Sequence, residues 1–448
     1  MWTPLPLLAL IACVRAPRRG AAPRADWSTV TFTDPTVEPG INEAGHTVVS
    51  GGMPIGNGET TALVFPVVSA FNSTAGFRLN EGVHILVGMT TAMASDMAPM
   101  SLGVVSIETD PPLGTVGFVQ RLHLTNATAE VTTSVGSVSV FVDSSSNRII
   151  ATTLSAGGRL LKVTTRVQSL RPESRFTYYG RCSTPSSAPD VWSSPAGDSS
   201  IGLSHRNADE DIALLNEPAA FNATLRQQGL SSLIDALQSS DKWRNRTFGL
   251  VVSSPTLKRD MARRGVLVSS SRHASIELTI TTHAAQTSSQ RQWERQVAGQ
   301  HHAHLQQQLA ASRGRHQVWW ASFWQRSHIW VSGPGALAAP TANLTERYAQ
   351  ARYVQAVQAG TWVPIKFNGM AFTAQLPPET ATSGPSYRQW GSCNWWQNTR
   401  LAYWNMIASA DWDSLATLFE YYLQMMPVRP PPKVEPRRCR AIVRTRMV

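Results

Sequence analysis

Cysteine is scarce in this sequence, and its scarcity excludes the small scaffolds that metals or disulfides hold together. The chain has 448 residues and four cysteines. Cys13 lies near the amino terminus, and the other three are too widely spaced for a zinc site or a compact disulfide framework. The pairing of Cys182, Cys393 and Cys439 stays open, with a bridge between the first two as one alternative.

Long apolar runs and nucleotide-binding motifs are also missing. The apolar stretch 5–14 is too short to span a bilayer, and no other run is long enough to do so. No GxSxG, Walker or dinucleotide-binding fingerprint occurs, and the glycine-rich segment 51–59 is typical of a turn before a strand. We therefore expect no membrane span and no cofactor.

Acidic residues are few, and the excess of positive charge lies at the two ends of the chain. The net charge is +11, of which residues 1–25 carry +4 and residues 427–448 carry +6. Residues 26–426 are thus left with +1. A nucleic-acid-binding surface should lie on the folded part of a chain, so we expect no nucleic-acid partner. The proline- and arginine-rich end, 427–448, is typical of a disordered tail.

The amino terminus is typical of an export signal. Small residues follow its apolar stretch, and cleavage after Ala16 would remove residues 1–16. Five sequons fit a secreted, extracellular glycoprotein. Their acceptor asparagines are Asn72, Asn126, Asn222, Asn245 and Asn343.

Short runs rich in Val, Thr, Ser and Ile fill residues 26–285 and predict a β domain. Several runs alternate apolar with polar residues, as Val138, Val140 and Val142 do, which is the period of a half-buried strand. Many such strands over about 250 residues favour one large antiparallel sandwich.

Three helices are expected after the strands. The first follows Thr287, where Trp293, Val297, His301, Leu305 and Leu309 recur three to four residues apart. The second covers 344–359, with Asn343 as its cap and Gly360 at its end. The third begins after Asp411 as cap, and Pro427 follows its last turn. Its expected apolar face comprises Leu415, Leu418, Phe419, Tyr422, Leu423 and Met426.

Tryptophan is unusually frequent, with ten of 15 residues between positions 319 and 412. Indole faces suit the C–H faces of sugar rings, but tryptophan also fills helical cores, and both interpretations stay open. Trp319, Trp320 and Trp324 are expected in a helical core. The histidines 301, 302 and 304 fit no standard set of metal ligands, so we expect solvated side chains and no metal site there.

Six sequence blocks resemble those of a known family. They are GGMPIGNGETTALVF (51–65), HRNADEDIALLNEPAAFNATLRQQGL (205–230), DKWRNRTFG (241–249), WWASFWQRSHIWV (319–331), VPIKFNGMAFT (363–373) and YRQWGSCNWWQNTRLAYWNMIASADWD (387–413). They are similar to secreted predicted glycoside hydrolases grouped under domain of unknown function 5703, distant relatives of the family 95 fucosidases and family 65 phosphorylases. The resemblance covers about residues 27–426.

The resemblance implies a multidomain fold of β and α parts: an antiparallel β-supersandwich at 26–285, a helical linker at 286–335 and an incomplete (α/α)6 six-hairpin barrel at 336–426. It also implies that the protein acts on an oligosaccharide or polysaccharide. The expected sugar-binding residues are Trp390, Trp395, Trp396, Gln397, Asn398, Arg400, Tyr403, Lys366 and Asn368. In the fucosidase relatives an Asn-rich segment ends in Tyr-Trp and helps to place the attacking water. Matching that ending to Tyr403 and Trp404 puts Asn398 on one asparagine position and Trp396 on the other, so the fucosidase substrate does not carry over.

Catalytic residues are not assigned. Twelve barrel helices need about three hundred residues, but only about ninety separate the linker from the tail. Glu346, Glu379, Asp411, Asp413 and Glu420 are better explained as cap, loop and surface groups. We therefore expect a truncated glycoside hydrolase-like chain, inactive if its later helices are missing. The alternative is a non-catalytic secreted protein with a carbohydrate-binding or structural role.

The export signal gives the first prediction. Because cleavage should remove residues 1–16, terminal sequencing of secreted protein should begin after Ala16 or at a position up to Ala25. Intact, unglycosylated protein recovered only from the cytosol would contradict it.

Overall fold

The computed structural model describes most of the chain between Trp27 and Gln424. The described residues are 27–35, 39–41, 47–49, 51–72, 78–94, 97–172, 175–176, 186–195, 197–207, 226–239, 241–367 and 394–424. The predicted signal, 1–16, the predicted tail, 427–448, Cys182, Cys393 and Cys439 lie outside these residues.

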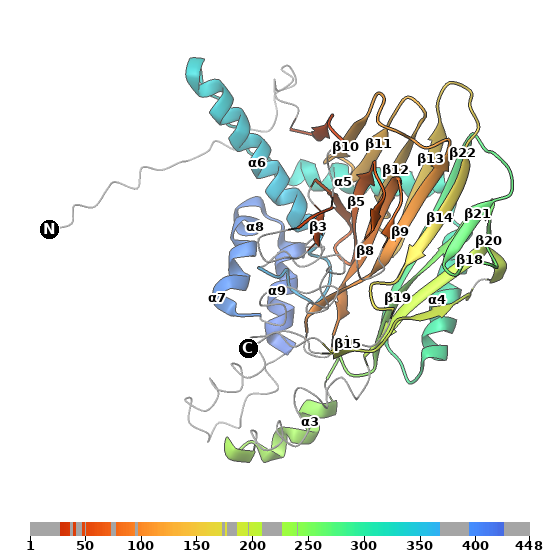
Figure 1. The fold of residues 1–448 in the computed structure, drawn as a ribbon. Coiled ribbons are helices and arrows are strands. Elements are labelled where there is room, and N and C mark those ends of the chain that lie inside the picture. The colour runs from red at the N-terminus through yellow and green to blue at the C-terminus, as the bar shows by residue number, and fades with distance from the viewer. Residues whose placement is uncertain are drawn as a thin grey trace.

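A nine-stranded antiparallel sheet forms one layer of the fold (Figure 1). In spatial order its strands are β1 (Thr29–Phe32), β10 (Val119–His123), β11 (Thr128–Thr132), β12 (Gly136–Val142), β13 (Arg148–Ser155), β22 (Ser275–Gln286), β19 (Arg246–Ser253), β18 (Ser200–Arg206) and β17 (Val191–Ser193). Strands β10 to β13 form a meander, and the later strands β17, β18, β19 and β22 complete the sheet.

A seven-stranded antiparallel sheet forms the second layer. Its strands in order are β20 (Leu257–Arg259), β21 (Val266–Ser269), β14 (Lys162–Gln168), β9 (Pro99–Asp110), β8 (Gly82–Met93), β5 (Thr60–Val67) and β4 (Met53–Gly56). Three two-stranded ladders accompany the sheets: β2 (Pro39–Ile41) with β3 (Thr47–Val49), β6 (Phe71–Asn72) with β7 (Arg78–Leu79), and β15 (Arg175–Phe176) with β16 (Ser186–Ser187).

The two sheets pack face to face, as the alternating sequence pattern predicts. Val138, Val140 and Val142 of β12 are fully buried, and they share one apolar core with Ile85 of β8 and Ile107 of β9. Ser137 and Ser139 on β12 are only partly buried, because successive side chains of a strand point to opposite faces, whereas Phe141 on that opposite face is buried. The predicted antiparallel β-sandwich is therefore confirmed.

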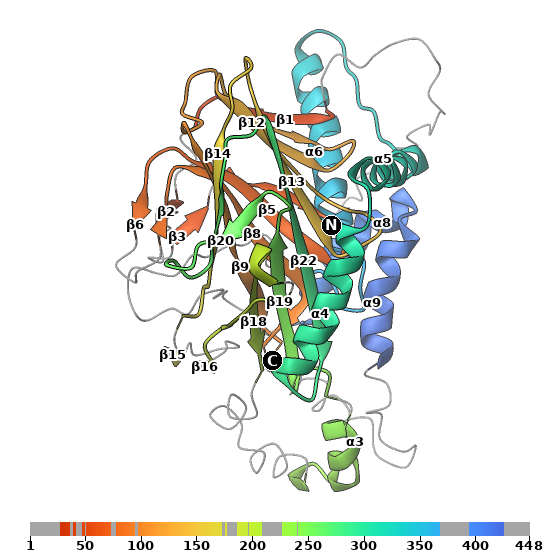
Figure 2. The same cartoon turned by 90° about the vertical axis from the view of Figure 1, so that its right-hand side faces the viewer.

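Two helices cover the nine-stranded sheet. Helix α4 (Gln290–Leu305) packs along β19 and β22 (Figure 2). Trp293 is fully buried there, and its indole N–H donates to the carbonyl of His283 at 3.1 Å. Helix α5 (Leu309–Arg326) buries Trp320 and Phe323 in the sandwich core. Trp320 thus has the expected core position, whereas Trp319 is partly exposed.

Short helical turns also occur at η1 (Gly197–Ser199), η2 (Ser231–Leu233) and α3 (Ile234–Ser239).

The helix predicted at 344–359 begins six residues earlier. After a short turn, η3 (Gly335–Leu337), helix α6 covers Ala338–Ala356. Asn343 therefore lies inside the helix, exposed, and does not cap it. Pro340 explains the earlier start, since proline is tolerated in a first helical turn, where the backbone N–H has no helical partner.

The carboxyl-terminal helices form a separate small core beside α6 (Figure 1). They are α7 (Trp396–Thr399), η4 (Arg400–Tyr403), α8 (Trp404–Ser409) and α9 (Trp412–Gln424). The predicted apolar face of α9 is only partly right: Leu415 and Leu418 are buried, but Phe419 and Leu423 are exposed and Tyr421 is buried instead. No described helix is long and apolar enough to cross a membrane.

A buried ion pair joins α6 to the turn between α8 and α9. The Arg352 guanidinium donates two hydrogen bonds to the Asp411 carboxylate, at 2.7 Å and 2.8 Å. It also donates to the carbonyls of Phe323 and Ser327, at the end of α5. Ser409 donates a further bond to Asp411 at 2.6 Å. Both charges are almost fully buried and well supplied with partners, as such pairs require.

The backbone turns at Ala410, and this turn directs the Asp411 side chain toward α6. It has a left-handed backbone, φ 56°, and ends α8 so that α9 starts one residue after Asp411. The Asp411 carboxylate thus serves the ion pair, although the sequence predicts it as a helix cap.

Asp411→Ala should destabilise the protein by about 3–5 kcal/mol, because it leaves the Arg352 charge buried without its partner. Urea unfolding measures the change. Asp413→Ala is the matched control: its side chain is 87% exposed beside Arg326, so the free energy of unfolding should change by less than about 1 kcal/mol. Equal losses from the two substitutions would contradict the structural role of the buried pair.

Candidate functional site

The segment from Trp395 to Trp404 forms a nearly continuous helical run. Trp395 has an extended backbone and precedes α7, and the turns α7, η4 and α8 then follow without a break. Gln355 of α6 holds this run in place through a reciprocal pair of 2.7 Å hydrogen bonds with the Asn405 side chain. It also donates to the carbonyl of Ala402 at 2.8 Å. Helix α6 therefore holds one side of the segment, and the opposite side faces solvent.

Four side chains on that open face make the candidate site, here named the Trp396 surface: Trp396, Gln397, Arg400 and Trp404. Trp396 is 46% exposed and Trp404 is 56% exposed. Residues four apart are neighbours on a helix, which places Arg400 between the two rings. The Arg400 guanidinium lies 5.4 Å from the centre of the Trp404 ring, within the range of a cation–π contact.

The rings of Trp395 and Trp396 have different neighbours and do not form one flat platform. Trp395 is partly buried and stacks on Phe367, with ring centres 6.4 Å apart and planes 10° apart. Trp396 meets Tyr422 edge to face at 5.2 Å. Tyr422 in turn donates to the carbonyl of Asn394 at 3.0 Å. This support fixes the Trp396 ring and leaves nearly half of its surface open.

Asn398 and Gln397 differ in their exposure. Gln397 is exposed and lies on the Trp396 surface, whereas Asn398 is only partly exposed. The backbone N–H of Asn398 donates to the carbonyl of Trp395 at 3.1 Å, which starts the first helical turn. Trp404, which the sequence analysis used only to align the Tyr-Trp ending, belongs to the site. Its spacing of four from Arg400 was the available signal.

Tyr403 and Lys366 lie in the interior. The Tyr403 hydroxyl accepts a hydrogen bond from the backbone N–H of Ile365 at 2.6 Å and is 3.1 Å from the Thr417 hydroxyl. Burial raises the pKa of Tyr403 to about 12. Lys366 is also buried. These positions fit a structural role for both residues better than contact with a ligand. Trp390 and Asn368 lie outside the described residues.

The acidic residues that the sequence analysis considered as catalytic candidates have structural or surface positions where the structure describes them. Asp411 serves the buried pair with Arg352, and Asp413 pairs with Arg326 at 2.9 Å. Glu346 lies on α6 and the exposed Glu420 on α9, while Glu379 is outside the described residues.

The described sequons differ in accessibility. Asn343 is exposed on α6, but Asn126 and Asn245 are partly buried, and the Asn245 side-chain oxygen accepts a 2.9 Å hydrogen bond from Arg206. The Asn72 backbone lies in β6, and Asn222 is outside the described residues.

The histidines at 301 and 304 are buried, contrary to the predicted solvated helix face. His301 lies 2.7 Å from the Ser253 hydroxyl, and both rings lie 2.8 Å from the Thr281 hydroxyl. His302, between them, is exposed. The physical reason is that α4 packs on β19 and β22, whose Ser and Thr hydroxyls satisfy the ring nitrogens. No group of three or more potential metal-ligating side chains gathers among the described residues.

The sequence matches one family model. Residues 46–329 fit the domain of unknown function DUF5703, in its amino-terminal part, and this range is more than half of the chain. The chain belongs to the DUF5703 family. The match confirms the resemblance to DUF5703 within 46–329, which covers most of the sandwich together with α4 and α5, while the blocks 363–373 and 387–413 lie beyond it. The Trp396 surface of this DUF5703 protein lies beyond the matched range.

Solved structures similar to the DUF5703 protein are carbohydrate enzymes by name. A predicted kojibiose phosphorylase from the human microbiome has a TM-score of 0.45 at 13% identity, with 79% of this chain and 44% of that chain covered. A family 92 inverting mannosidase from Bacteroides thetaiotaomicron has a TM-score of 0.32 at 10% identity, with 73% and 39% covered. This chain thus spans less than half of either enzyme. No curated protein matches the sequence. At these TM-scores the likeness carries no argument about activity.

The buried histidines of this DUF5703 protein predict a loss of stability in acid. Burial lowers the pKa of His301 and His304 to about 4, below the ordinary 6.5. The unfolded chain therefore binds more protons between these pH values, so stability should be complete above pH 6.5 and fall as pH drops toward 4. Urea unfolding at pH 7 and pH 5 measures this loss.

His301→Gln should reduce the pH dependence by an amount on the order of 1 kcal/mol between pH 6.5 and 5. His302→Gln, at the exposed neighbouring position, is the matched control and should keep the pH dependence that the buried His301 and His304 cause. A wild-type stability that stays constant from pH 7 to pH 5 would show that these rings are not held neutral by the fold.

Proposed function

We propose that the protein binds carbohydrate at the Trp396 surface. The observation that carries the proposal is the pair of exposed indole rings, Trp396 and Trp404, on either side of Arg400. Indole faces contact the apolar C–H faces of a pyranose, and a guanidinium donates hydrogen bonds to its hydroxyl oxygens. Gln397 adds an amide that both donates and accepts. The surface offers both kinds of contact that a sugar ring needs.

The alternative role for such rings is plain core packing. Trp320 shows what that role looks like here: it is fully buried within the apolar core. Trp396 and Trp404 instead keep about half of their surfaces open while other residues hold the helical run in place. Contiguous exposed apolar surface on a folded protein often marks a binding site, which supports the binding role.

We further propose a glycoside hydrolase type of protein, exported from the cell, in which α6–α9 correspond to the first helices of an (α/α)6 barrel. This proposal rests on the order of the six sequence blocks and on membership in the DUF5703 family. Hydrolysis would need an acid and a base on opposite sides of the bond, which Asp411 and Asp413 do not supply because Arg352 and Arg326 hold them. Assay of purified protein against aryl glycosides tests for it, and no turnover on any of them would limit the protein to binding.

Trp396→Ala should weaken oligosaccharide binding about three- to tenfold by removing one stacking face. The oligosaccharide is chosen by a glycan screen with the wild-type protein, and isothermal titration calorimetry measures the affinities. Trp330→Ala is the matched control, because Trp330 is 48% exposed but lies outside the Trp396 surface, so its loss should not change affinity.

Trp320→Ala separates stability from binding. It should lower the free energy of unfolding by about 3–5 kcal/mol because it empties a buried site, yet leave the affinity per folded molecule unchanged. The proposal fails if Trp396→Ala lowers stability but leaves affinity per folded molecule as it was. It also fails if the glycan screen detects no binding by folded wild-type protein.

A further inference from the structure

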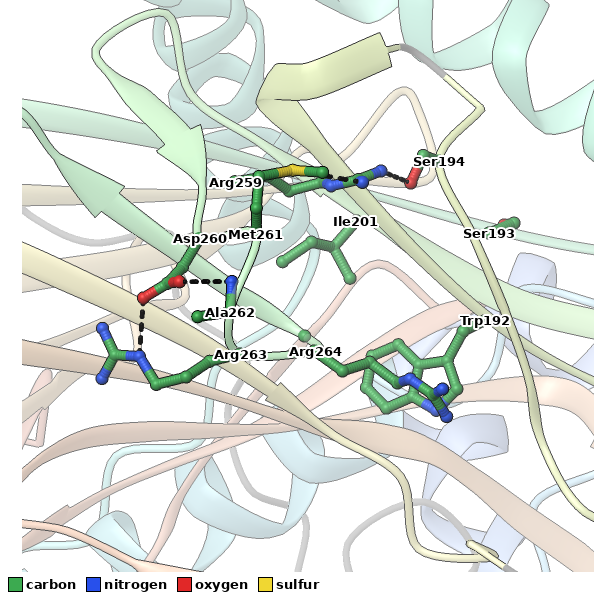
Figure 3. Close-up of a pocket in the computed structure, with 11 residues that line it drawn as sticks. Trp192, Ser193, Ser194, Ile201, Arg259, Asp260, Met261, Ala262, Arg263 and Arg264 are labelled. Atoms are coloured by element: carbon green, nitrogen blue, oxygen red, sulfur yellow. Dashed lines mark hydrogen bonds and ion pairs between the residues drawn. The ribbon is translucent and has the colours of Figure 1, made fainter.

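A pocket of about 420 Å³ lies where the edges of the two sheets meet (Figure 3). Strands β18 and β20 beside it lie on the side of the sandwich away from α7–α9 (Figure 1). Its walls come from β17, at the edge of the nine-stranded sheet, and from the loop 260–265 that follows β20, at the edge of the seven-stranded sheet. Ile201 of β18 lines it between them. The volume lies in the lower part of the range for small-molecule sites, about 300–1,000 Å³.

The wall contributed by the end of β20 and this loop is strongly basic. Arg259, Arg263 and Arg264 line the pocket together with one acid, Asp260. Asp260 is committed to its own loop: its carboxylate accepts hydrogen bonds from Arg263 at 2.6 Å and from the backbone N–H of Ala262 at 2.9 Å. The hydrogen bond from Arg263 is the main cause of a lowered pKa of Asp260, and the bond from Ala262 adds to it. Asp260 is therefore ionised at neutral pH, and its negative charge offsets the positive charge of Arg263.

Two of the three arginines thus remain to attract an anion. Arg259, at the end of β20, donates to the hydroxyl of Ser194, which follows β17 in the opposite wall (Figure 3). This hydrogen bond fixes the Arg259 guanidinium at the pocket. No described residue forms an ion pair or hydrogen bond with the Arg264 side chain, which is exposed. A guanidinium presents several N–H donors in one plane and matches a carboxylate, sulfate or phosphate group.

Trp192 adds an aromatic surface beside these charges. Its ring lies directly against Gly265, where an added Cβ would come within 2.8 Å of the ring. Gly265 also has a positive φ of 75°, which a side chain would strain. The backbone therefore accommodates the ring at this position, and Trp192 is only partly buried. A ligand in the pocket would meet an apolar ring and cationic groups together.

We propose that this pocket binds an acidic saccharide unit, with its carboxylate or sulfate group at Arg264 and Arg259 and its sugar ring against Trp192. A free inorganic anion would use the arginines but not the indole ring. The site is separate from the Trp396 surface and needs no part of the function proposed for it.

The test is calorimetric titration of the full chain with a disaccharide that bears both a sulfate and a carboxylate. The neutral counterpart of this disaccharide and inorganic sulfate serve as comparison ligands. Arg264→Gln should weaken binding of the acidic disaccharide about tenfold, since it removes a charged donor. Lys258→Gln is the matched control: Lys258 is exposed on β20 and does not line the pocket, so affinity should not change. Trp396→Ala should also leave this affinity unchanged.

Three results would overturn the proposal. Equal weakening by Arg264→Gln and Lys258→Gln would show attraction to general surface charge. Inorganic sulfate binding as tightly as the acidic disaccharide would show a site for free anions, without a sugar contact. Binding of the neutral disaccharide as strongly as the acidic one, or no binding of either, would remove the role of the arginines.

Discussion

The buried pair of Arg352 and Asp411 is the interaction on which the helical part of the molecule depends. One guanidinium bonds the Asp411 carboxylate and the last carbonyls of α5, so it ties three helical segments together. Its cation also lies 4.1 Å from the centre of the Phe323 ring, whose side chain belongs to the sandwich core. The carboxyl-terminal helices are thereby anchored to the β layers by a polar group that costs free energy to bury unless every partner is present.

This anchoring explains why the Trp396 surface can be both ordered and exposed. Gln355 and Arg352 lie on the same helix, α6, and fix the run 396–409 and the following turn from the protein side. The side of this run that faces away from α6 is not needed to hold it in place, so Trp396, Arg400 and Trp404 remain available to a ligand. A rigid, preformed set of aromatic and polar groups loses little conformational entropy on binding.

The sandwich was predictable because its signal is local, whereas the site depends on contacts between distant residues. The alternation of Val138, Val140 and Val142 indicates a half-buried strand, and those residues are buried as expected. The burial of His301 and His304 was not predictable, since it requires the hydroxyls of Ser253 and Thr281 from two other strands. Likewise the sequence suggests Asp411 as a helix cap, and only folding brings Arg352 to it. The grouping of tryptophans did indicate the region of the candidate site, but the division between the buried Tyr403 and the exposed Trp404 depends on how η4 packs against α9.

The central claim is that carbohydrate binds the outer side of the run 396–404. Hydrogen exchange followed by mass spectrometry, with and without a saturating neutral oligosaccharide, tests it most directly because it locates the ligand on the chain. We expect slower exchange in peptides that cover 396–404 and unchanged exchange in α4, which lies on the sandwich. Slowed exchange elsewhere, with 396–404 unaffected by a bound oligosaccharide, would rule out binding at the Trp396 surface.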